Sequence, residues 1–386
     1  MTKKEMPHRN FVFVSNMNGA PWGGSEELWA GAALRLAKEG TSVAASICSW
    51  SPLHAKVTEL AHAGVAIQVR RPRHSIFRRA WQKVTKPTQA LEDLEIAKLI
   101  SAASPALVVM SCTPFWLSLI EECARKEVPF VTVSQANTES LWPNDLIADR
   151  FRRLLPAARR CYFVSNANRR LTEYQIGCEL PNAEIVWNPF NVRRDVSLGW
   201  PELSADGELR LASVARLHPA SKGHDILFEA LACPRWRSRR WHLRLYGDGP
   251  MRDTIVRMIS RLGLTDRVSL AGFVDSIENV WAENHALVMP SRYEGMPLAM
   301  VEAMLCARPV LATDVADHAE IVIDGITGFL ADATTARSVD NALERLWTNR
   351  MNLRSIGETA AARIRAKLPL DPVRDFVEKL KREANT

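Results

Sequence analysis

Short apolar runs alternate with amphipathic stretches through the first half of the chain. Runs of this length are typical of buried strands, and the stretches between them carry apolar residues at helical spacing. We predict strands at Asn10 to Ser15, Val43 to Ile47, Ala66 to Val69, Ala106 to Ser111, Phe130 to Val133 and Cys161 to Ser165, and helices at Glu26 to Glu39, Lys56 to Ala63 and Trp116 to Lys126. This alternation predicts a parallel sheet with crossover helices, the doubly wound arrangement.

A second series of the same kind follows Pro181 to Pro201, a stretch with three prolines and little periodicity that we interpret as the domain boundary. Here we predict strands at Leu209 to Ala215, His242 to Tyr246, Val268 to Ala271, Leu287 to Pro290, Pro309 to Thr313 and Gly328 to Leu330. We predict helices at His224 to Ala232, Met251 to Leu262, Val280 to Asn284, Ala336 to Trp347, Ser355 to Lys367 and Val373 to Glu383. A length of 386 residues also favours two domains. The expected fold class is α/β, with two doubly wound, Rossmann-like domains facing a central cleft.

Composition indicates a soluble globular protein. Hydrophobic residues make up 47% and charged residues 24% of the chain. We find no stretch near the roughly 18 apolar residues that a membrane-spanning helix needs, and the start of the chain is not typical of a signal peptide. The seven cysteines form no CxxC pair, so we expect buried thiols in a reducing cytoplasm rather than disulfides or a metal site.

The net charge of +7 lies wholly in the first half of the chain. Residues 1–193 hold 24 Lys and Arg against 17 Asp and Glu, whereas residues 194–386 hold 26 of each sign. This asymmetry predicts an acidic partner for the first domain. Arginines also flank tryptophans between Arg235 and Arg244, but no nucleic-acid module surrounds them, and solvated surfaces explain them better.

Much of this charge falls in Arg70 to Lys86, which has seven basic residues and no acidic one. Apolar residues at helical spacing face one side of this stretch and basic residues the other. We weigh a peripheral contact with an anionic membrane surface against an ordinary surface helix packed on the domain core. The membrane hypothesis assigns the contact to Ile76, Phe77, Arg78, Arg79, Trp81 and Lys83.

The most informative stretch runs from Ser291 to Met304 and predicts a strand, a tight loop and a helix. The start of such a helix offers unpaired backbone N–H groups and the positive end of a dipole, so it can hold a phosphate or diphosphate. Glu294 lies just before the helix and Glu302 about one turn inside it. One anion-binding helix end flanked by two acids indicates a phosphorylated sugar as ligand.

Other loops that follow strands carry matching chemistry. Arg216 and Lys222 lie a few residues apart in one loop, where two cations can neutralise a diphosphate. Gly247 and Gly249 form a turn with room for a flat nucleoside, and Phe273 follows a further strand. In the first half, Gly23 and Gly24 precede a helix, where they either admit a bound group or only form a tight turn.

The segment from Ala212 to Leu330 closely resembles the family 4 retaining glycosyltransferases of GT-B fold. The resemblance rests on Val-Ala-Arg-Leu, Ser-Lys-Gly-His-Asp, Leu-Tyr-Gly-Asp-Gly-Pro, Val-Ser-Leu-Ala-Gly-Phe and the stretch from Ser291 to Met304. It implies that Glu302 holds the ribose hydroxyls, that Glu294 contacts the donor sugar, and that Arg216 with Lys222 binds the diphosphate. Further donor contacts are expected from Gly295, Met296, Pro297 and Leu298.

The resemblance also implies a domain plan. Residues 1–190 form the acceptor-binding domain, residues 191–368 the nucleotide-sugar domain, and residues 369–386 a helix that returns to the first domain. Many relatives place a histidine near the donor sugar, but the comparable stretch here has none. Ser134, Gln135 and Asn137 are its candidate replacements at the acceptor or sugar.

The expected activity is transfer of a hexose from a UDP- or GDP-sugar to a hydroxyl acceptor, a lipid-linked or polysaccharide-precursor glycan, with retention. No Asp-x-Asp motif is present, so we expect no metal and no other cofactor. Expected partners are the nucleotide sugar and the glycan or glycolipid, and no nucleic acid. The protein is expected in the cytoplasm, with peripheral association at the inner face of the cell membrane as an option. Alternatives are a GT-B sugar-nucleotide epimerase and a membrane-surface scaffold protein that retains the fold.

Overall fold

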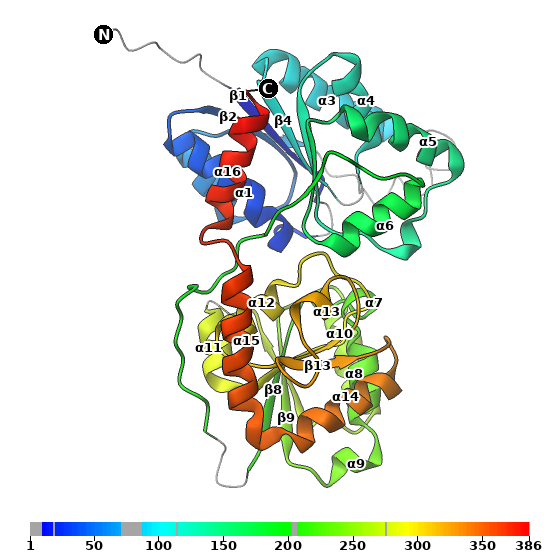
Figure 1. Ribbon diagram of the computed structural model, residues 1–386, viewed down its shortest axis with the longest axis vertical. Coiled ribbons are helices and arrows are strands. Elements are labelled where there is room, and N and C mark those ends of the chain that lie inside the picture. The colour runs from blue at the N-terminus through cyan, green and yellow to red at the C-terminus, as the bar shows by residue number, and fades with distance from the viewer. Residues whose placement is uncertain are drawn as a thin grey trace. The chain divides into compact units, whose positions relative to one another are not determined.

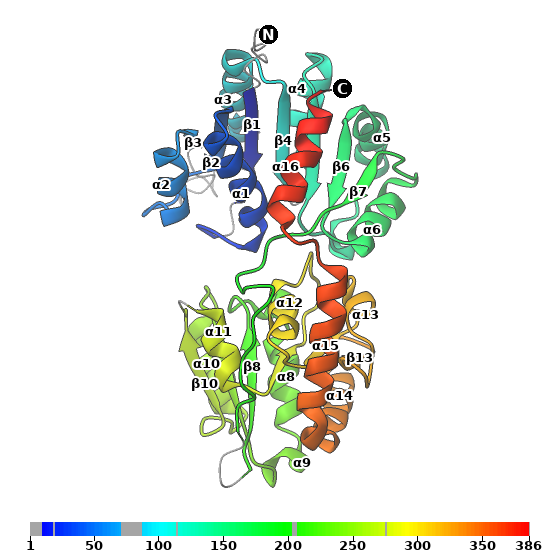
Figure 2. The same ribbon diagram turned by 60° about the vertical axis from the view of Figure 1, so that its left-hand side comes forward.

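The computed structural model describes residues 10–17, 20–70, 87–112, 115–202, 207–274 and 276–385. They divide into two compact units, one made of residues 1–189 and 371–386 and the other of residues 190–370. The sequence analysis placed the domain boundaries between residues 190 and 191 and between residues 368 and 369. Figures 1 and 2 show that each unit is a central sheet with helices on both faces.

In the described part of the first unit the strands form one parallel sheet in the order β3-β2-β1-β4-β5-β6-β7. These strands are β1 (Asn10–Ser15), β2 (Ser42–Cys48), β3 (Ala66–Arg70), β4 (Leu107–Cys112), β5 (Phe130–Ser134), β6 (Arg160–Phe163) and β7 (Ala183–Ile185). The helices are α1 (Gly24–Lys38), α2 (Ala55–His62), α3 (Pro87–Ala103), α4 (Leu117–Arg125), α5 (Asp145–Leu154), α6 (Asn166–Ile176) and α16 (Pro372–Glu383). Two single-turn 3-10 helices add η2 (Glu139–Leu141) and η3 (Leu155–Ala157).

The described part of the second unit has a parallel sheet in the order β10-β9-β8-β11-β12-β13. Its strands are β8 (Leu209–Val214), β9 (Trp241–Tyr246), β10 (Val268–Gly272), β11 (Ala286–Met289), β12 (Val310–Thr313) and β13 (Gly328–Ala331). Its helices are α7 (Pro219–Lys222), α8 (His224–Leu231), α9 (Pro234–Arg237), α10 (Arg252–Arg261), α11 (Ile277–Glu283), α12 (Leu298–Leu305), α13 (His318–Ile321), α14 (Ala336–Thr348) and α15 (Leu353–Lys367), with the 3-10 helix η4 (Arg350–Asn352). The predicted doubly wound arrangement is confirmed in both units.

Each sheet is buried on both faces, which explains its apolar strands. In the first unit Val12, Val108 and Met110 have no exposed surface, and in the second unit Leu211 and Leu243 have none. Burial on this scale removes the period-2 alternation of an exposed strand. The apolar runs of the sequence are therefore the inner strands of the two sheets.

The C-terminal helix α16 belongs to the first unit, where it lies beside α1 (Figure 1). A Cβ atom on Gly31 of α1 would lie 2.9 Å from Val373, so the two helices approach closely at this glycine. Phe376 packs edge-on against Tyr162 of β6, with ring centroids 5.4 Å apart. Ion pairs join Arg160 to Glu383 at 3.1 Å and Lys379 to Glu184 at 3.1 Å.

The predicted boundary stretch, Pro181 to Pro201, also holds a strand that the sequence analysis did not predict, because β7 occupies Ala183–Ile185 and pairs with β6. This edge strand has three residues, all half-buried. It is too short to show an alternating pattern of apolar and polar residues. The chain passes from one unit to the other between Pro189 and Phe190.

Candidate functional site

The strand order of the second sheet reverses between β8 and β11. In doubly wound sheets, ligands bind outside the carboxyl ends of the strands at such a switch point, because the flanking loops diverge there. The loop after β8 carries Arg216 and Lys222, and the loop after β11 carries Glu294. The predicted donor residues thus meet at the switch point of this sheet.

An ion pair joins these two loops. Lys222 Nζ donates to Glu294 Oε1 at 2.6 Å, and the carboxyl group of Glu294 also accepts from Ser291 Oγ at 2.7 Å. Arg292 adds a two-point contact to Asp225 at the start of α8, at 2.8 and 2.6 Å. The pairing fixes the position of the Lys222 ammonium group beside the start of α12.

Glycine is required where the two loops touch. Gly223 ends α7 in the left-handed region with φ 65°, and a Cβ atom there would lie 1.9 Å from the carbonyl oxygen of Pro290. Gly263 has a similar φ of 69° but nothing within 4 Å of the same atom. The two glycines therefore differ in close contact rather than in backbone conformation.

We expect Gly263→Ala to lower the free energy of unfolding by about 1 kcal/mol through backbone strain alone. Gly223→Ala is expected to cost about 1 to 3 kcal/mol more, because the added methyl group overlaps the Pro290 backbone. Urea denaturation followed by tryptophan fluorescence measures both values. Equal losses in the two variants would show that the loops do not need this close approach.

Glu294 is ionised in this environment. Burial works against its charge, but the Lys222 ammonium and the Ser291 hydroxyl outweigh burial and hold the pKa of the carboxyl below its usual value. Its side chain is only 8% exposed. The buried carboxylate of Glu294 is stabilised mainly by the Lys222 ammonium group. The positions of these two side chains are therefore coupled.

His318 at the start of α13 is a neighbour of Glu294 that the sequence analysis did not single out. Its side chain is fully buried, and its Nδ1 lies 2.7 Å from the carbonyl oxygen of Thr313. Burial lowers the pKa of this imidazole, so it is neutral, and a neutral ring that donates from Nδ1 leaves Nε2 as an acceptor. Nε2 has no hydrogen-bond partner among the described residues.

Glu302 lies on α12 and is 3% exposed. Its Oε1 accepts two hydrogen bonds from Asn191, one from the backbone N–H and one from the side-chain amide, both at 2.9 Å. Burial raises the pKa of this carboxyl to about 7, although the two bonds from Asn191 act to lower it. Oε2 makes no hydrogen bond to a described residue, which leaves it available for a ligand hydroxyl.

The start of α12 has the properties expected of an anion site. Pro297 caps the helix without a side-chain hydrogen bond, and the N–H groups of Met300 and Val301 return to its carbonyl oxygen. For the N–H groups of Leu298 and Ala299 there is no acceptor among the described residues. Gly295, Met296 and Pro297 are buried in the loop that leads to them.

Two cations surround His218 in the loop after β8. Arg216 is exposed and forms no ion pair with any described residue. Burial lowers the pKa of His218, and the positive charges of Arg216 and Lys222 lower it further. The Nδ1 atom of His218 lies 2.8 Å from Ser221 Oγ.

The turn with Gly247 and Gly249 packs on this same loop. A Cβ atom on Gly247 would lie 2.3 Å from the carbonyl oxygen of Ala215, and one on Gly249 would lie 2.7 Å from that of Leu217. These glycines are therefore needed for contact between two loops, apart from any room they leave for a nucleoside. Phe273, after β10, is 83% exposed and free to contact a flat ligand.

The first-unit candidates have mixed surroundings. Gly23 caps α1 in an extended conformation, and Gly24 begins this helix. Gln135 is buried, donates to Ser111 Oγ at 3.4 Å and accepts from Asn188 Nδ2 at 2.9 Å. Asn137 donates to Thr172 and Gln175 of α6, at 2.9 and 2.7 Å. Gln135 and Asn137 thus hold the loop after β5, while Ser134 is buried at the end of that strand.

Two basic stretches have different outcomes. The proposed membrane contact at residues 76–83 lies outside the described part of the chain. Between Arg235 and Arg244, Trp236 and Trp241 are core residues with 1% and 2% exposure, and Arg239 pairs with Glu344 at 2.6 Å. These tryptophans pack the second domain and do not form an aromatic surface.

Cysteine placement follows the sequence prediction in part. All seven cysteines are free thiols, and those at 112, 123, 161 and 306 are buried. Among the residues that the structure describes, no three His, Cys, Asp or Glu side chains are grouped so as to hold a metal ion. The helices of this same part of the chain are too short or too polar to cross a bilayer.

Both units have the doubly wound sheets of the GT-B fold, and solved structures confirm this class over almost the whole chain. Anabaena Alr3699/HepE in complex with UDP matches with a TM-score of 0.73 and 18% identity, covering 96% of this chain and 99% of that one. Staphylococcus aureus TarM matches with a TM-score of 0.73 and 12% identity, covering 98% and 100%.

Residues 208–349, which lie within the second unit, match the family model described as glycosyl transferases group 1. Alpha-D-kanosaminyltransferase of Streptomyces kanamyceticus is 31% identical over 42% of this chain and 43% of its own length. Poly(ribitol-phosphate) alpha-N-acetylglucosaminyltransferase of Staphylococcus aureus is 25% identical over 55% and 44%. The chain thus aligns with less than half of the length of these curated relatives.

Proposed function

We propose that the protein is a retaining glycosyltransferase that moves a hexose from a UDP- or GDP-sugar to a hydroxyl acceptor. The observation that carries the proposal is the Lys222–Glu294 pair, which lies at the switch point of the second sheet beside the uncapped start of α12. Cations and backbone N–H groups gathered there suit a diphosphate. The UDP complex of the similar Anabaena protein supports a nucleotide donor.

Each donor part has a group of matching chemistry. Arg216, Lys222 and the N–H groups of Leu298 and Ala299 bind the diphosphate. Glu302 accepts hydrogen bonds from the ribose hydroxyls through Oε2, and Glu294 accepts one from a hydroxyl of the hexose. When the diphosphate binds, the Lys222 ammonium group donates hydrogen bonds to it as well as to Glu294, which is its partner in the free protein.

Transfer proceeds by attack on the same face of the sugar. The bond from the anomeric carbon to the phosphate oxygen breaks, the bond to the acceptor oxygen forms, and the departing phosphate oxygen takes the acceptor proton. The protein stabilises the charge that develops on the leaving group. We assign Glu294 to positioning the sugar rather than to nucleophilic attack; its Oε1 accepts hydrogen bonds from Lys222 and Ser291. Two cations and the helix dipole serve in place of a divalent metal ion.

The acceptor is a hydroxyl group of a polysaccharide precursor or lipid-linked glycan. Support comes from relatives whose names state such acceptors, among them the poly(ribitol-phosphate) enzyme and a lipopolysaccharide outer core galactosyltransferase. The basic first half of the chain favours an acidic acceptor or an anionic membrane surface, with peripheral association at the inner face of the cell membrane.

Thermal unfolding tests the donor site directly. In buffer with EDTA, UDP or GDP at 100 times its Kd is expected to stabilise the protein by about 2.7 kcal/mol, because it binds only the native state. UMP and GMP serve as matched controls without the second phosphate and should shift Tm much less. A Tm shift that appears only with added Mg²⁺ would contradict the role of Arg216 and Lys222, and no shift with any nucleotide would contradict the proposed function. A sugar nucleotide converted to its epimer without acceptor would instead identify an epimerase.

A further inference from the structure

Asn191 bonds Glu302, and the sequence analysis did not single it out. It is the second residue of the second unit, just after the chain enters from the first. Its backbone N–H and its side-chain amide both donate to Glu302 Oε1, each at 2.9 Å. Two donors from one residue on the same oxygen fix the orientation of the carboxyl group and leave Oε2 as the oxygen available to a ligand.

The segment that carries this asparagine is attached to α12 a second time, through α15. The Arg365 guanidinium group on α15 donates to the carbonyl oxygens of Arg194 and Val196, at 3.0 and 2.8 Å. It also donates to that of Leu305, the last residue of α12, at 2.8 Å. Arg194 in turn donates to the carbonyl oxygen of Arg365. The asparagine is therefore presented to the carboxyl group by a segment that is already fixed to the same helix.

The two bonds from Asn191 act on the charge of Glu302. Burial raises the pKa of this carboxyl to about 7, and the bonds from Asn191 oppose the rise because both stabilise the ionised form. The carboxyl group is 3% exposed, so little water is present to replace a lost donor. Asn191 is thus the partner that favours the carboxylate over the acid.

Other ionisable groups on and around α12 leave this balance in place. Cys306, one turn beyond Glu302, stays a neutral thiol because burial raises its pKa to about 12. The Lys222–Glu294 ion pair beside the start of the helix has no net charge. The charges that act on the Cys306 thiol are those of Arg308, Glu278, Glu302 and Arg365. The pKa of Glu302 itself responds to burial and to Asn191.

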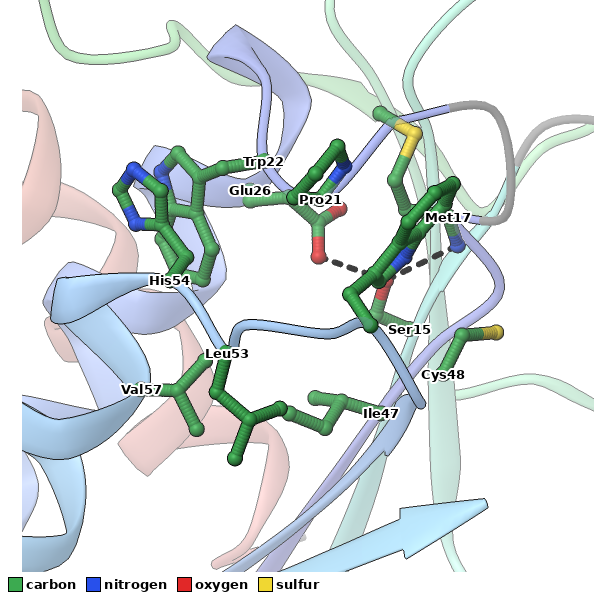
Figure 3. Close-up of a pocket in the computed structure, with 11 residues that line it drawn as sticks. Ser15, Met17, Pro21, Trp22, Glu26, Ile47, Cys48, Leu53, His54 and Val57 are labelled. Carbon is green, nitrogen blue, oxygen red and sulfur yellow. Dashed lines mark hydrogen bonds between the residues drawn. The ribbon is translucent and has the colours of Figure 1, made fainter. Parts of the chain in front are cut away.

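Glu26 in the first unit is a second buried acid with different partners. Burial raises the pKa of its carboxyl to about 7 as well. Its Oε2 accepts from Ser15 Oγ at 2.7 Å, as Figure 3 shows, and from Trp29 Nε1 at 2.9 Å. These partners come from the first unit, so a change at Asn191 leaves them in place. Glu26 is therefore an internal reference for Glu302.

We propose that Asn191 is a positioning residue for the donor ribose, holding the Glu302 carboxylate by Oε1 so that Oε2 accepts the ribose hydroxyls. The inference rests on the proposed function, because the ribose belongs to the nucleotide sugar. An aspartate at this position would keep the backbone bond but replace the amide donor by an acceptor, and so favour the protonated acid. A protonated carboxyl group is a weaker acceptor for ribose hydroxyls than a carboxylate.

Carbon-13 NMR of the glutamate carboxyl groups in the full, donor-free chain measures the effect of Asn191 directly. Glu302→Gln and Glu26→Gln assign the two signals expected to titrate near pH 7. Asn191→Ala, a change at an exposed residue, is expected to raise the midpoint of the Glu302 signal by about one pH unit, because a hydrogen bond to the ionised form is lost. Asn191→Asp should raise it at least as far, and the Glu26 midpoint should stay in place.

Calorimetric donor affinity at pH 7 and pH 9 connects this effect to the ribose. With the midpoint raised by about one pH unit, Asn191→Ala should bind UDP-glucose or GDP-mannose about fivefold more weakly than the wild type at pH 7 and almost equally at pH 9. A purely structural defect would weaken binding equally at both pH values. Asn352→Asp makes a matched change at an exposed asparagine of η4 and should leave both affinities unchanged.

Two results would overturn the role of Asn191: an unchanged Glu302 midpoint in Asn191→Ala, or an equal loss of donor affinity at pH 7 and pH 9. The Tm shift by UDP or GDP is measured on the same samples. If the wild type shows no shift, the proposed function and the ribose assignment fail together. If the shift is present while the midpoint does not move, only the inference about Asn191 fails.

Discussion

Lys222→Ala is expected to lower kcat/KM for sugar transfer by about 30-fold to 1000-fold, which corresponds to about 2 to 4 kcal/mol of lost leaving-group stabilisation. The ammonium group lies 2.6 Å from Glu294 Oε1 beside the start of α12, where the departing diphosphate would gather charge. Initial rates at several donor concentrations measure the change. Arg354→Ala is the matched control, since it removes an exposed cation of α15 that pairs with Glu358 one turn along the same helix.

The same substitution leaves the Glu294 carboxylate buried with one fewer partner, so part of the loss can arise from the position of Glu294. A double-mutant cycle with Lys222→Met and Glu294→Gln separates the two effects. If Glu294 only positions Lys222, the double variant will be as active as Lys222→Met. If Glu294 also contacts the hexose, the double variant will be less active. Full activity of Lys222→Ala would remove the diphosphate assignment altogether.

Apolar patterning predicted most strands because both sheets are buried on both faces. It missed α5 and α6, whose start signals were present in the sequence: Asn144 Oδ1 accepts from the N–H of Ile147 and Ser165 Oγ from that of Asn168, at 3.0 and 3.1 Å. The only buried residue of α5 is Ala148, so the apolar stripe of this helix is weak. A helix with a strong N-cap but a weak apolar stripe is missed when only hydrophobic periodicity is used to find helices.

Within the candidate site, residues on one motif were predictable and their distant partners were not. Glu294 and Glu302 follow from the spacing around a helix start. Asn191, which holds Glu302, lies 111 residues away in the sequence, and no local pattern links the two. His318 was missed for the same reason, since its relation to Glu294 exists only after β11 and β12 pair.

The glycine turn shows a different limit of sequence reasoning. Gly247 and Gly249 suggested room for a nucleoside, but each also permits contact with the loop after β8. A missing side chain is compatible with both a bound ligand and a packed backbone. The sequence contains no information on which atom fills the space.

Donor affinity is expected to fall about tenfold between pH 8 and pH 6, because Glu302 must be ionised to accept two ribose hydroxyls and burial raises its pKa to about 7. The probe is UDP-glucose or GDP-mannose, whichever stabilises the protein, since the phosphates of these diesters do not titrate in this range. Calorimetry at pH 6 in buffers of different ionisation enthalpy should detect release of nearly one proton on binding. An affinity that is flat from pH 6 to pH 8 would contradict the assignment of Glu302 to the ribose.

The stability of the free protein should change in the opposite direction. Glu302 has a folded-state pKa of about 7 against an ordinary value of 4.5, so the folded state binds its proton more tightly. The resulting stability is fully present below pH 4.5 and is lost as pH rises through 7, a loss of about 3 kcal/mol. The free energy of unfolding of Glu302→Gln should therefore change with pH by about 1.4 kcal/mol per pH unit less than that of the wild type between pH 5 and 7.

Glu26 has the same raised pKa in the other unit, so Glu26→Gln is the matched control. It should flatten the stability profile equally while leaving the pH dependence of donor affinity intact, because of these two acids only Glu302 lies on α12.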